Sequence, residues 1–119
     1  MAKGDYETKD SGEREQFNTG SQRDTRKGKG RYDLLPVRAI LRDAQLLERG
    51  ADKYGDRNWE LGQPLSRYAD SGLRHFMQAL QGCTDEDHWA AVRFNVGAIM
   101  EQQGRIAEGT LDAVLDDLP

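Results

Sequence analysis

Three carboxylates, Glu48, Asp70 and Asp87, fall on three separate helical segments of the sequence. His88 and Asn95 follow Asp87 at a spacing that aligns them along one side of a helix. This group is rich in oxygen donors and contains no sulfur, which suits Mg²⁺ or Mn²⁺ rather than structural zinc. Hard divalent ions held by carboxylates most often handle phosphates. The residue types therefore favour a phosphate site in which these three carboxylates bind metal and position water.

A second cluster lies where the first long helical segment gives way to a loop. Its side chains suit a planar, phosphorylated ligand, because aromatic rings stack on a base while amide and cationic groups bind its edge and its phosphates. We assign stacking to Tyr54 or Trp59, the base edge to Asn58, and the phosphates to Lys53 and Arg57. The alternative is that Trp59 closes the end of the core and the charges face solvent.

Structural alternatives also exist for the helical site residues. Glu48 lies at the margin of an apolar stripe, where an internal salt bridge would satisfy it. Asp70 and Arg74 have the spacing of an exposed ion pair, which contributes little to stability. His75 and His88 border apolar stripes, where a hydrogen-bonded structural histidine is the usual finding. The combination of His, Asn and Asp on one segment favours a site over these alternatives.

The composition limits the class of protein. A chain of 119 residues has room for one compact domain, and its formal charge of −4 gives no overall attraction to nucleic acid or to an acidic membrane. Cys83 is the lone cysteine, and the sequence has neither a signal peptide nor an apolar run long enough to span a bilayer. We expect a cytoplasmic protein with no membrane partner and no stable nucleic-acid binding.

Apolar residues recur at spacings of three and four, which is typical of helices. The pattern predicts helices over about 36–54, over about 65–81, and from beyond Thr84 to about 107, followed by a short C-terminal helix capped by Thr110. The predicted fold is all-α, a small bundle of three main helices plus the short one. The stripes expected to face the core are Ile40, Ala44, Leu47, Ala51 and Tyr54; Leu65, Ala69, Leu73, Phe76, Met77 and Leu80; and Trp89, Val92, Val96, Ile99 and Met100.

Residues 1–30 hold almost no aliphatic side chains and many charged ones, so they predict a disordered polar arm before a helical domain over 31–119. At its end, Lys29 and Arg31 either close over a bound phosphate or are simply solvated. Three helices give a thin core and leave apolar residues exposed. We therefore expect a homo-oligomer, a dimer or tetramer, that buries the remaining apolar surface.

Four ordered motifs carry a family resemblance: GRYDLLP (30–36), GADKYGDRNW (50–59), SRYADSGLRH (66–75) and DHWAAVRFN (87–95). Together they resemble the phage-associated dATP/dGTP diphosphohydrolase N-terminal family, which is similar to the MazG-like all-α nucleotide pyrophosphohydrolases. The likeness covers about residues 29–103.

The resemblance implies an α-helical, usually oligomeric enzyme that uses Mg²⁺ or Mn²⁺ to hydrolyse a purine deoxynucleoside triphosphate to a shorter nucleotide plus phosphate or pyrophosphate. At the positions that match the family motifs, the resemblance implies that metal is bound and water positioned by Glu48, Asp70 and Asp87. It implies that phosphates are bound by Lys53, Arg67 and Arg74. The polar lining of the pocket would be His75, His88 and Asn95.

One departure from the wider MazG-like group matters. The GluGluxxGlu and GluxxAsp elements of that group do not occur in the expected helices, and Glu48 with Asp52 is a thinner set of metal ligands. A nucleotide-binding or nucleotide-sequestering phage protein that has lost catalysis is therefore the first alternative. A helical protein-interaction module with no ligand is the second.

Overall fold

The computed structural model describes Gly4 and residues 6–119. The chain forms two compact units, which divide between Leu35 and Pro36. The predicted all-α class is confirmed, since the long elements are helices and the one sheet of the described residues is a two-stranded hairpin. No helix of the described residues is both long enough and apolar enough to cross a membrane.

The N-terminal unit holds the hairpin, which the sequence pattern did not predict. Strands β1 (Arg14–Gln16) and β2 (Gln22–Asp24) pair antiparallel, with Arg14 opposite Asp24. Polar contacts accompany the pairing: the Arg14 guanidinium donates to Asp10 at 2.7 Å, and Lys29 Nζ donates to Asp24 at 2.6 Å. Because strands of three polar residues have no apolar alternation, periodicity had no signal to detect.

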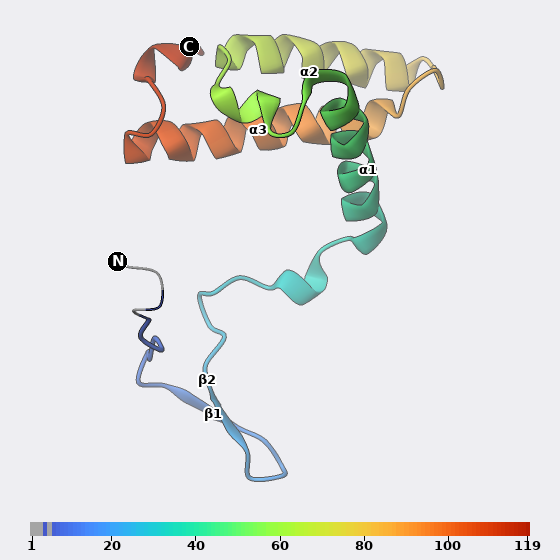
Figure 1. The fold of residues 1–119 in the computed structure, drawn as a ribbon. Coiled ribbons are helices and arrows are strands. Elements are labelled where there is room, and N and C mark those ends of the chain that lie inside the picture. The colour runs from blue at the N-terminus through green and yellow to red at the C-terminus, as the bar shows by residue number, and fades with distance from the viewer. Residues whose placement is uncertain (1–3, 5) are drawn as a thin grey trace. The chain divides into compact units, whose positions relative to one another are not determined.

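The helical unit begins with α1 (Val37–Tyr54), which ends at Gly55 in a backbone conformation of φ +89° that favours glycine. The short 3₁₀ helix η2 (Asn58–Leu61) connects it to α2 (Leu65–Leu80). Helix α3 (His88–Glu108) then returns antiparallel to α2, and Figure 1 shows the two side by side with α1 crossing α3.

Helices α2 and α3 meet through two large side chains, Leu65 and Tyr68, and otherwise through small and polar residues. The buried positions follow the spacing of one helix face on each side: Leu65, Tyr68, Gly72 and His75 on α2, and His88, Ala91, Asn95, Ala98 and Gln102 on α3. A Cβ added at Gly72 would lie 3.3 Å from the Asn95 Cβ, so glycine permits the close approach of the two helices at this point.

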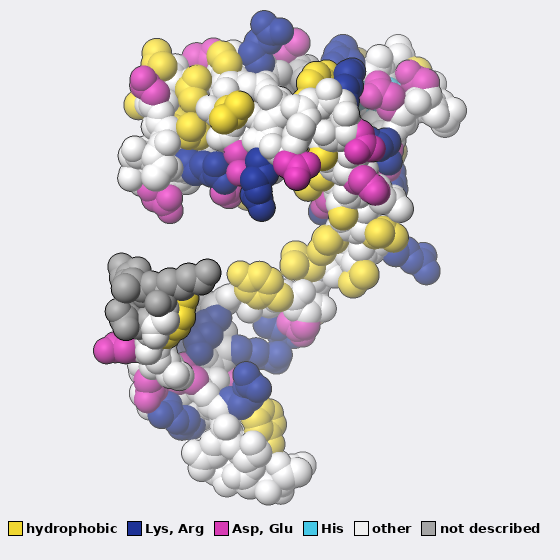
Figure 2. Space-filling view, in the orientation of Figure 1, with side chains coloured by type: hydrophobic (Ala, Val, Ile, Leu, Met, Phe, Trp, Pro, Cys, Tyr) yellow, Lys and Arg dark blue, Asp and Glu magenta, His cyan; other side chains and the backbone are white. Residues whose placement is uncertain are grey.

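Most of the predicted apolar stripes lie outside this contact. Leu73 is 70% exposed and Met77 is 59% exposed, although both belong to the stripe expected to face the core. On α1 the part-buried side includes Ala39, Asp43 and Leu46, whereas the stripe around Leu47 remains open. Figure 2 shows hydrophobic side chains at the lower end of α1 on the visible face. We use the term outer apolar face for the exposed apolar residues of these stripes on α1, α2 and α3, together with the exposed Leu41 of α1.

The C-terminal segment packs back onto the start of α2. Asp117 accepts hydrogen bonds from the Ser66 N–H at 2.8 Å and from the Ser66 hydroxyl at 2.5 Å. The last element is a single 3₁₀ turn, η3 (Ala113–Leu115), capped by Asp112. The predicted cap Thr110 instead donates its hydroxyl to the Arg105 carbonyl oxygen, and the side chain that caps α3 is Asp87.

Candidate functional site

An open cleft of about 690 Å³ lies where α1 meets the turn between α2 and α3. Two arginines of α1, Arg42 and Arg49, line it from one side. The turn and the first residues of α3 supply the other side: Gly82, Cys83, Thr84, Asp85, Glu86, Asp87, His88 and Trp89. Cationic, acidic, imidazole and indole groups therefore share one surface, which combines the chemistry of an anion site with that of a metal site.

Asp87 has two structural partners. The Arg42 guanidinium donates to both of its oxygens, at 2.8 and 2.5 Å, and the Ala90 N–H donates to it at 3.1 Å as a helix cap. The hydrogen bonds from Arg42 are the main reason that the pKa of Asp87 falls to about 2. The predicted metal and water ligand is thus an ionised carboxylate that joins α1 to the start of α3.

The two histidines meet inside the α2–α3 contact. The Nδ1 atoms of His75 and His88 lie 2.9 Å apart, and the side chains are 8% and 3% exposed. On its other side, the Nε2 of His88 lies 2.8 Å from an oxygen of Asp85, and this contact lowers the pKa of Asp85. Burial, helped by the nearby charge of Arg74, lowers the pKa of His75, which favours its neutral form.

Among the described residues, one group of three metal-binding side chains lies close enough to share an ion: His75, Glu86 and His88, whose ligand atoms all lie within 4.8 Å of one another. Glu48, Asp52 and Asp70 are exposed on α1 and α2 and are not part of such a group in the single chain. The donor set that does converge contains two imidazoles and one carboxylate. This set fits a divalent transition-metal ion better than Mg²⁺, which prefers oxygen ligands.

The predicted loop residues divide between core and solvent. Trp59 packs edge-on against Phe94, with ring centres 5.8 Å apart, and belongs to the margin of the core. Tyr54 is exposed, and the Lys53 ammonium lies 5.0 Å from the centre of its ring. Arg57 pairs with Glu60 at 2.7 Å, and Asn58 is exposed beside it. Trp59 therefore closes the end of the core, as the structural alternative for it proposed.

The remaining helical residues lie on both sides of the α2–α3 contact. Asn95 is buried there and donates to the Ala91 carbonyl oxygen at 2.8 Å. Arg67 and Arg74 are exposed on α2, and neither lines the cleft. Of the predicted set, the structure thus brings His75, His88 and Asp87 to one end of the helix pair. The roles of the others stay predictions.

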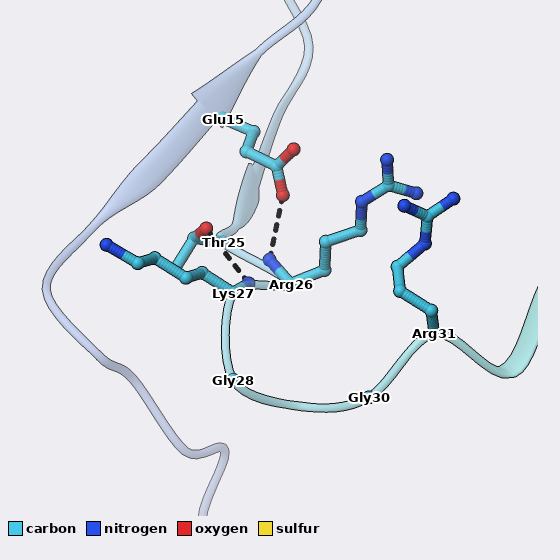
Figure 3. Close-up of a pocket in the computed structure, with 7 residues that line it drawn as sticks. All are labelled: Glu15, Thr25, Arg26, Lys27, Gly28, Gly30 and Arg31. Carbon is cyan, nitrogen blue, oxygen red and sulfur yellow. Dashed lines mark hydrogen bonds between the residues drawn. The ribbon is translucent and has the colours of Figure 1, made fainter.

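Lys29 and Arg31 belong to a separate basic loop of the N-terminal unit. Arg31 pairs with Asp33 through two hydrogen bonds of 2.8 and 2.7 Å, and Lys29 pairs with Asp24. A hollow of about 600 Å³ lies along this loop, lined by Glu15, Thr25, Arg26, Lys27, Gly28, Gly30 and Arg31. Figure 3 shows the Arg26 and Arg31 guanidinium groups beside each other, with Lys27 pointing away from them.

Sequence reasoning missed Arg42, Arg49, Asp85, Glu86 and Trp89, which line the cleft. The signal for Asp85 and Glu86 was present, because acidic residues before a helix are expected near its positive end. That structural role alone accounts for acidic residues at this position, so it does not indicate a site. Arg42 and Arg49 are seven residues apart and so share a helix side, but this spacing is common on solvated faces.

Comparison with known proteins gives one match. The family model described as dATP/dGTP diphosphohydrolase, N-terminal, matches residues 19–111, which cover the basic loop, all three α-helices and the cleft. Neither the curated proteins nor the solved structures gave a match. Since the matched region spans most of the sequence, the chain belongs to the dATP/dGTP diphosphohydrolase N-terminal family.

Proposed function

We propose that this chain binds a purine deoxynucleoside triphosphate in the cleft beside the α2–α3 turn and hydrolyses it to a shorter nucleotide plus phosphate or pyrophosphate. The observation that carries the proposal is the pairing of two arginines with an acidic and imidazole-bearing turn, in a chain of a family named for this activity. The family description refers to an N-terminal region, so the complete reaction is part of the proposal.

Hydrolysis of a triphosphate requires that the charge of its phosphates is neutralised and that the substrate is held in position. A triphosphate is a polyanion, and guanidinium groups bind phosphate oxygens in a planar, two-pronged geometry. Arg49 lines the cleft, and Arg42 is held in place by Asp87. Trp89 is 44% exposed at the same cleft and offers an aromatic surface to a base. These residues would bind the phosphates and orient the base.

A bound divalent ion, Mg²⁺ or Mn²⁺ in our expectation, would neutralise phosphate charge and lower the pKa of a bound water. His75, Glu86 and His88 are the residues of the cleft region with the geometry to hold one, and they suit Mn²⁺ better than Mg²⁺. Glu48, Asp52 and Asp70 remain candidate ligands.

We further propose that the active form is a homo-oligomer. Helix α1 has no buried residue, and the outer apolar face includes Leu41, Leu47, Leu73 and Met77, all exposed. A second copy presents the same face, so a symmetric contact would cover both at once. Glu48 lies on the α1 part of this face, one helical turn from Ala44 and Ala51. Association would bring it from solvent into an interface.

The direct test is product analysis. Purified protein is incubated with dATP, dGTP, dCTP and dTTP in turn, each with Mg²⁺ or Mn²⁺, and the nucleotides are separated by ion-exchange chromatography. We expect the two purine substrates to yield shorter nucleotides. Arg49→Met should raise the KM for the triphosphate about tenfold or more, since a charge-assisted contact contributes about 1.5–3 kcal/mol. Arg38→Met, an exposed arginine of α1 outside the cleft, is the matched control.

A nucleotide-sequestering function is the second candidate, because the oxygens of Asp87 are engaged by Arg42 and Ala90 and the carboxylates of α1 and α2 do not converge in one chain. If the protein binds purine nucleotides saturably but forms no product after prolonged incubation, the proposed hydrolysis is wrong and sequestration is the function. If no nucleotide raises the melting temperature, both candidates are wrong, since a ligand that prefers the folded state must stabilise it.

A further inference from the structure

The two histidines at the α2–α3 contact could do more than form a structural hydrogen bond, because their ring nitrogens could also bind a metal ion. His75 and His88 are the two histidines of the whole chain, and they meet with their Nδ1 atoms 2.9 Å apart. Two unprotonated nitrogens cannot face each other at this distance without a proton or a cation between them. Without a metal, one ring must donate an N–H to the other.

Asp85 sets the protonation pattern of His88. Its carboxylate lies 2.8 Å from the His88 Nε2, so that nitrogen carries the proton and donates it to Asp85. The Nδ1 of neutral His88 is then a lone pair that points at His75. A carboxylate behind a histidine is the common arrangement around metal-binding imidazoles, because it fixes both the tautomer and the orientation of the ring.

Glu86 supplies the third donor. Its carboxylate is exposed, and its oxygen lies within 4.8 Å of the donor nitrogens of both histidines. Two ligand atoms bound at right angles, each about 2.1 Å from one ion, are about 3.0 Å apart, close to the separation of the two Nδ1 atoms. Small rotations of the two rings would turn both Nδ1 lone pairs from each other toward one point, and a movement of the exposed Glu86 side chain would then complete a three-sided donor set.

We propose that His75, His88 and Glu86 bind a divalent transition-metal ion, of the class of Zn²⁺, Co²⁺ or Mn²⁺, in preference to Mg²⁺, with Asp85 as a positioning residue. Imidazole nitrogen is a good ligand for these ions and a poor one for Mg²⁺. Glu86 and His88 line the cleft, so the coordination positions that these three ligands leave free are reached from there. The ion would link α2 to α3 and stabilise the fold, whether or not a nucleotide is hydrolysed.

The test uses the full chain without a histidine tag, stripped with chelator, in the absence of nucleotide. Co²⁺ binding is followed by its visible absorption, and Zn²⁺ and Mg²⁺ are measured by competition. Because the chain has just two histidines, long-range ¹H–¹⁵N spectra report both rings without ambiguity. We expect both Nδ1 signals to move to metal-bound positions with Zn²⁺ and to remain unmoved with Mg²⁺.

Variants separate ligands from their neighbours. His75→Gln or His88→Gln should reduce Co²⁺ affinity about 100-fold or more, and Asp85→Asn about 10-fold or more, as loss of an outer hydrogen-bond partner does elsewhere. Glu86→Gln should also weaken binding, whereas Glu108→Gln, an exposed glutamate at the far end of α3, should not. Cys83→Ser removes the exposed thiol of the cleft as a rival ligand and should leave the affinity unchanged.

Two results would overturn the proposal. In one, Zn²⁺ leaves both imidazole Nδ1 signals unmoved; in the other, Mg²⁺ competes on equal terms. Should the histidine variants fail to fold, Asp85→Asn and Glu86→Gln still decide, because both side chains are exposed. If the Co²⁺ affinity is unchanged in both variants, His75 and His88 form only a structural hydrogen bond. Since no nucleotide is present, failure here is distinct from failure of the proposed hydrolysis.

Discussion

The contact between α2 and α3 and the outer apolar face are opposite in character. The inner contact adds glycine, alanine and buried polar groups such as His75, Asn95 and Gln102 to a small apolar cluster around Leu65 and Tyr68, whereas the outer face carries large apolar side chains such as Leu73 and Met77. An isolated domain of ordinary design would have the reverse arrangement.

Because they differ in composition, the α2–α3 contact and the outer apolar face are expected to have different roles. Polar groups between helices are tolerated when each has a partner, and no buried side-chain nitrogen or oxygen of the described residues lacks one. Gln102 donates to the Tyr68 hydroxyl at 2.6 Å and to the Trp59 carbonyl oxygen at 3.0 Å. The inner contact thus fixes the register of the helices and the geometry of the site. The outer face leaves large apolar side chains exposed, and the proposed homo-oligomer would bury them.

The largest effect is expected on the outer face. Leu41→Asp combined with Leu73→Asp places charges where a second copy would pack, and should prevent the proposed homo-oligomer from forming and leave a monomer that loses cooperative unfolding. Light scattering after gel filtration measures the mass, and circular dichroism at several protein concentrations measures the melting temperature. Val114→Asp, at a residue that is 75% exposed on η3, is the control. If the wild-type protein is a monomer whose melting temperature does not depend on its concentration, no second copy packs on the outer apolar face.

The inner contact should be more tolerant of a single change. Gln102→Ala removes hydrogen bonds to Tyr68 and Trp59 and leaves a small cavity, so we expect the free energy of unfolding to fall by about 1–3 kcal/mol. The neighbour Gln103 is exposed, and Gln103→Ala should change stability by less than about 0.5 kcal/mol. Chemical denaturation of both variants gives the comparison, and equal effects would show that the Gln102 network adds no stability.

Periodicity predicted where the helices lie but not which side of each faces its neighbour. The bounds of α1 and α2 agree with the sequence to within a residue. The stripe containing Leu73 and Met77 was expected inside because burial was assumed to be intramolecular. The α2–α3 contact instead includes small and polar residues such as Gly72 and Asn95, which hydrophobic periodicity does not identify.

The candidate site was predicted in part for the same reason. His75 and His88 were singled out as polar residues beside apolar stripes, and they proved to be central to the α2–α3 contact. Arg42 could not be identified, because its partner Asp87 lies 45 residues away and nothing in a single sequence pairs them. Contacts between distant segments depend on how the helices cross, which residue spacing does not determine.

A smaller effect should separate the structural and chemical roles of Asp87. Asp87→Ala removes both the cap of α3 and the pair with Arg42, and should cost about 1–2 kcal/mol of unfolding free energy. Asp87→Asn keeps a good capping side chain and loses the charge, so most of the stability should remain. If Asp87 positions water or metal, turnover falls in the Asn variant at nearly unchanged melting temperature. Full turnover would leave Asp87 a purely structural residue.

The smallest effect concerns the C-terminal segment, which packs onto the start of α2. Hydrogen bonds from Ser66 lower the pKa of Asp117, so the carboxylate contributes stability that is present above the ordinary aspartate range and is lost as the pH falls through its own lower pKa. Acidification from pH 5 toward pH 2 should therefore release Asp117 from the start of α2. The Ser66 amide resonance and its hydrogen exchange follow the release, with Asp117→Asn as the variant whose contact no longer depends on pH. Because Asp117 is exposed, the melting temperature of the whole unit should hardly respond, whereas a large fall would mean that the C-terminal segment supports the helix pair itself.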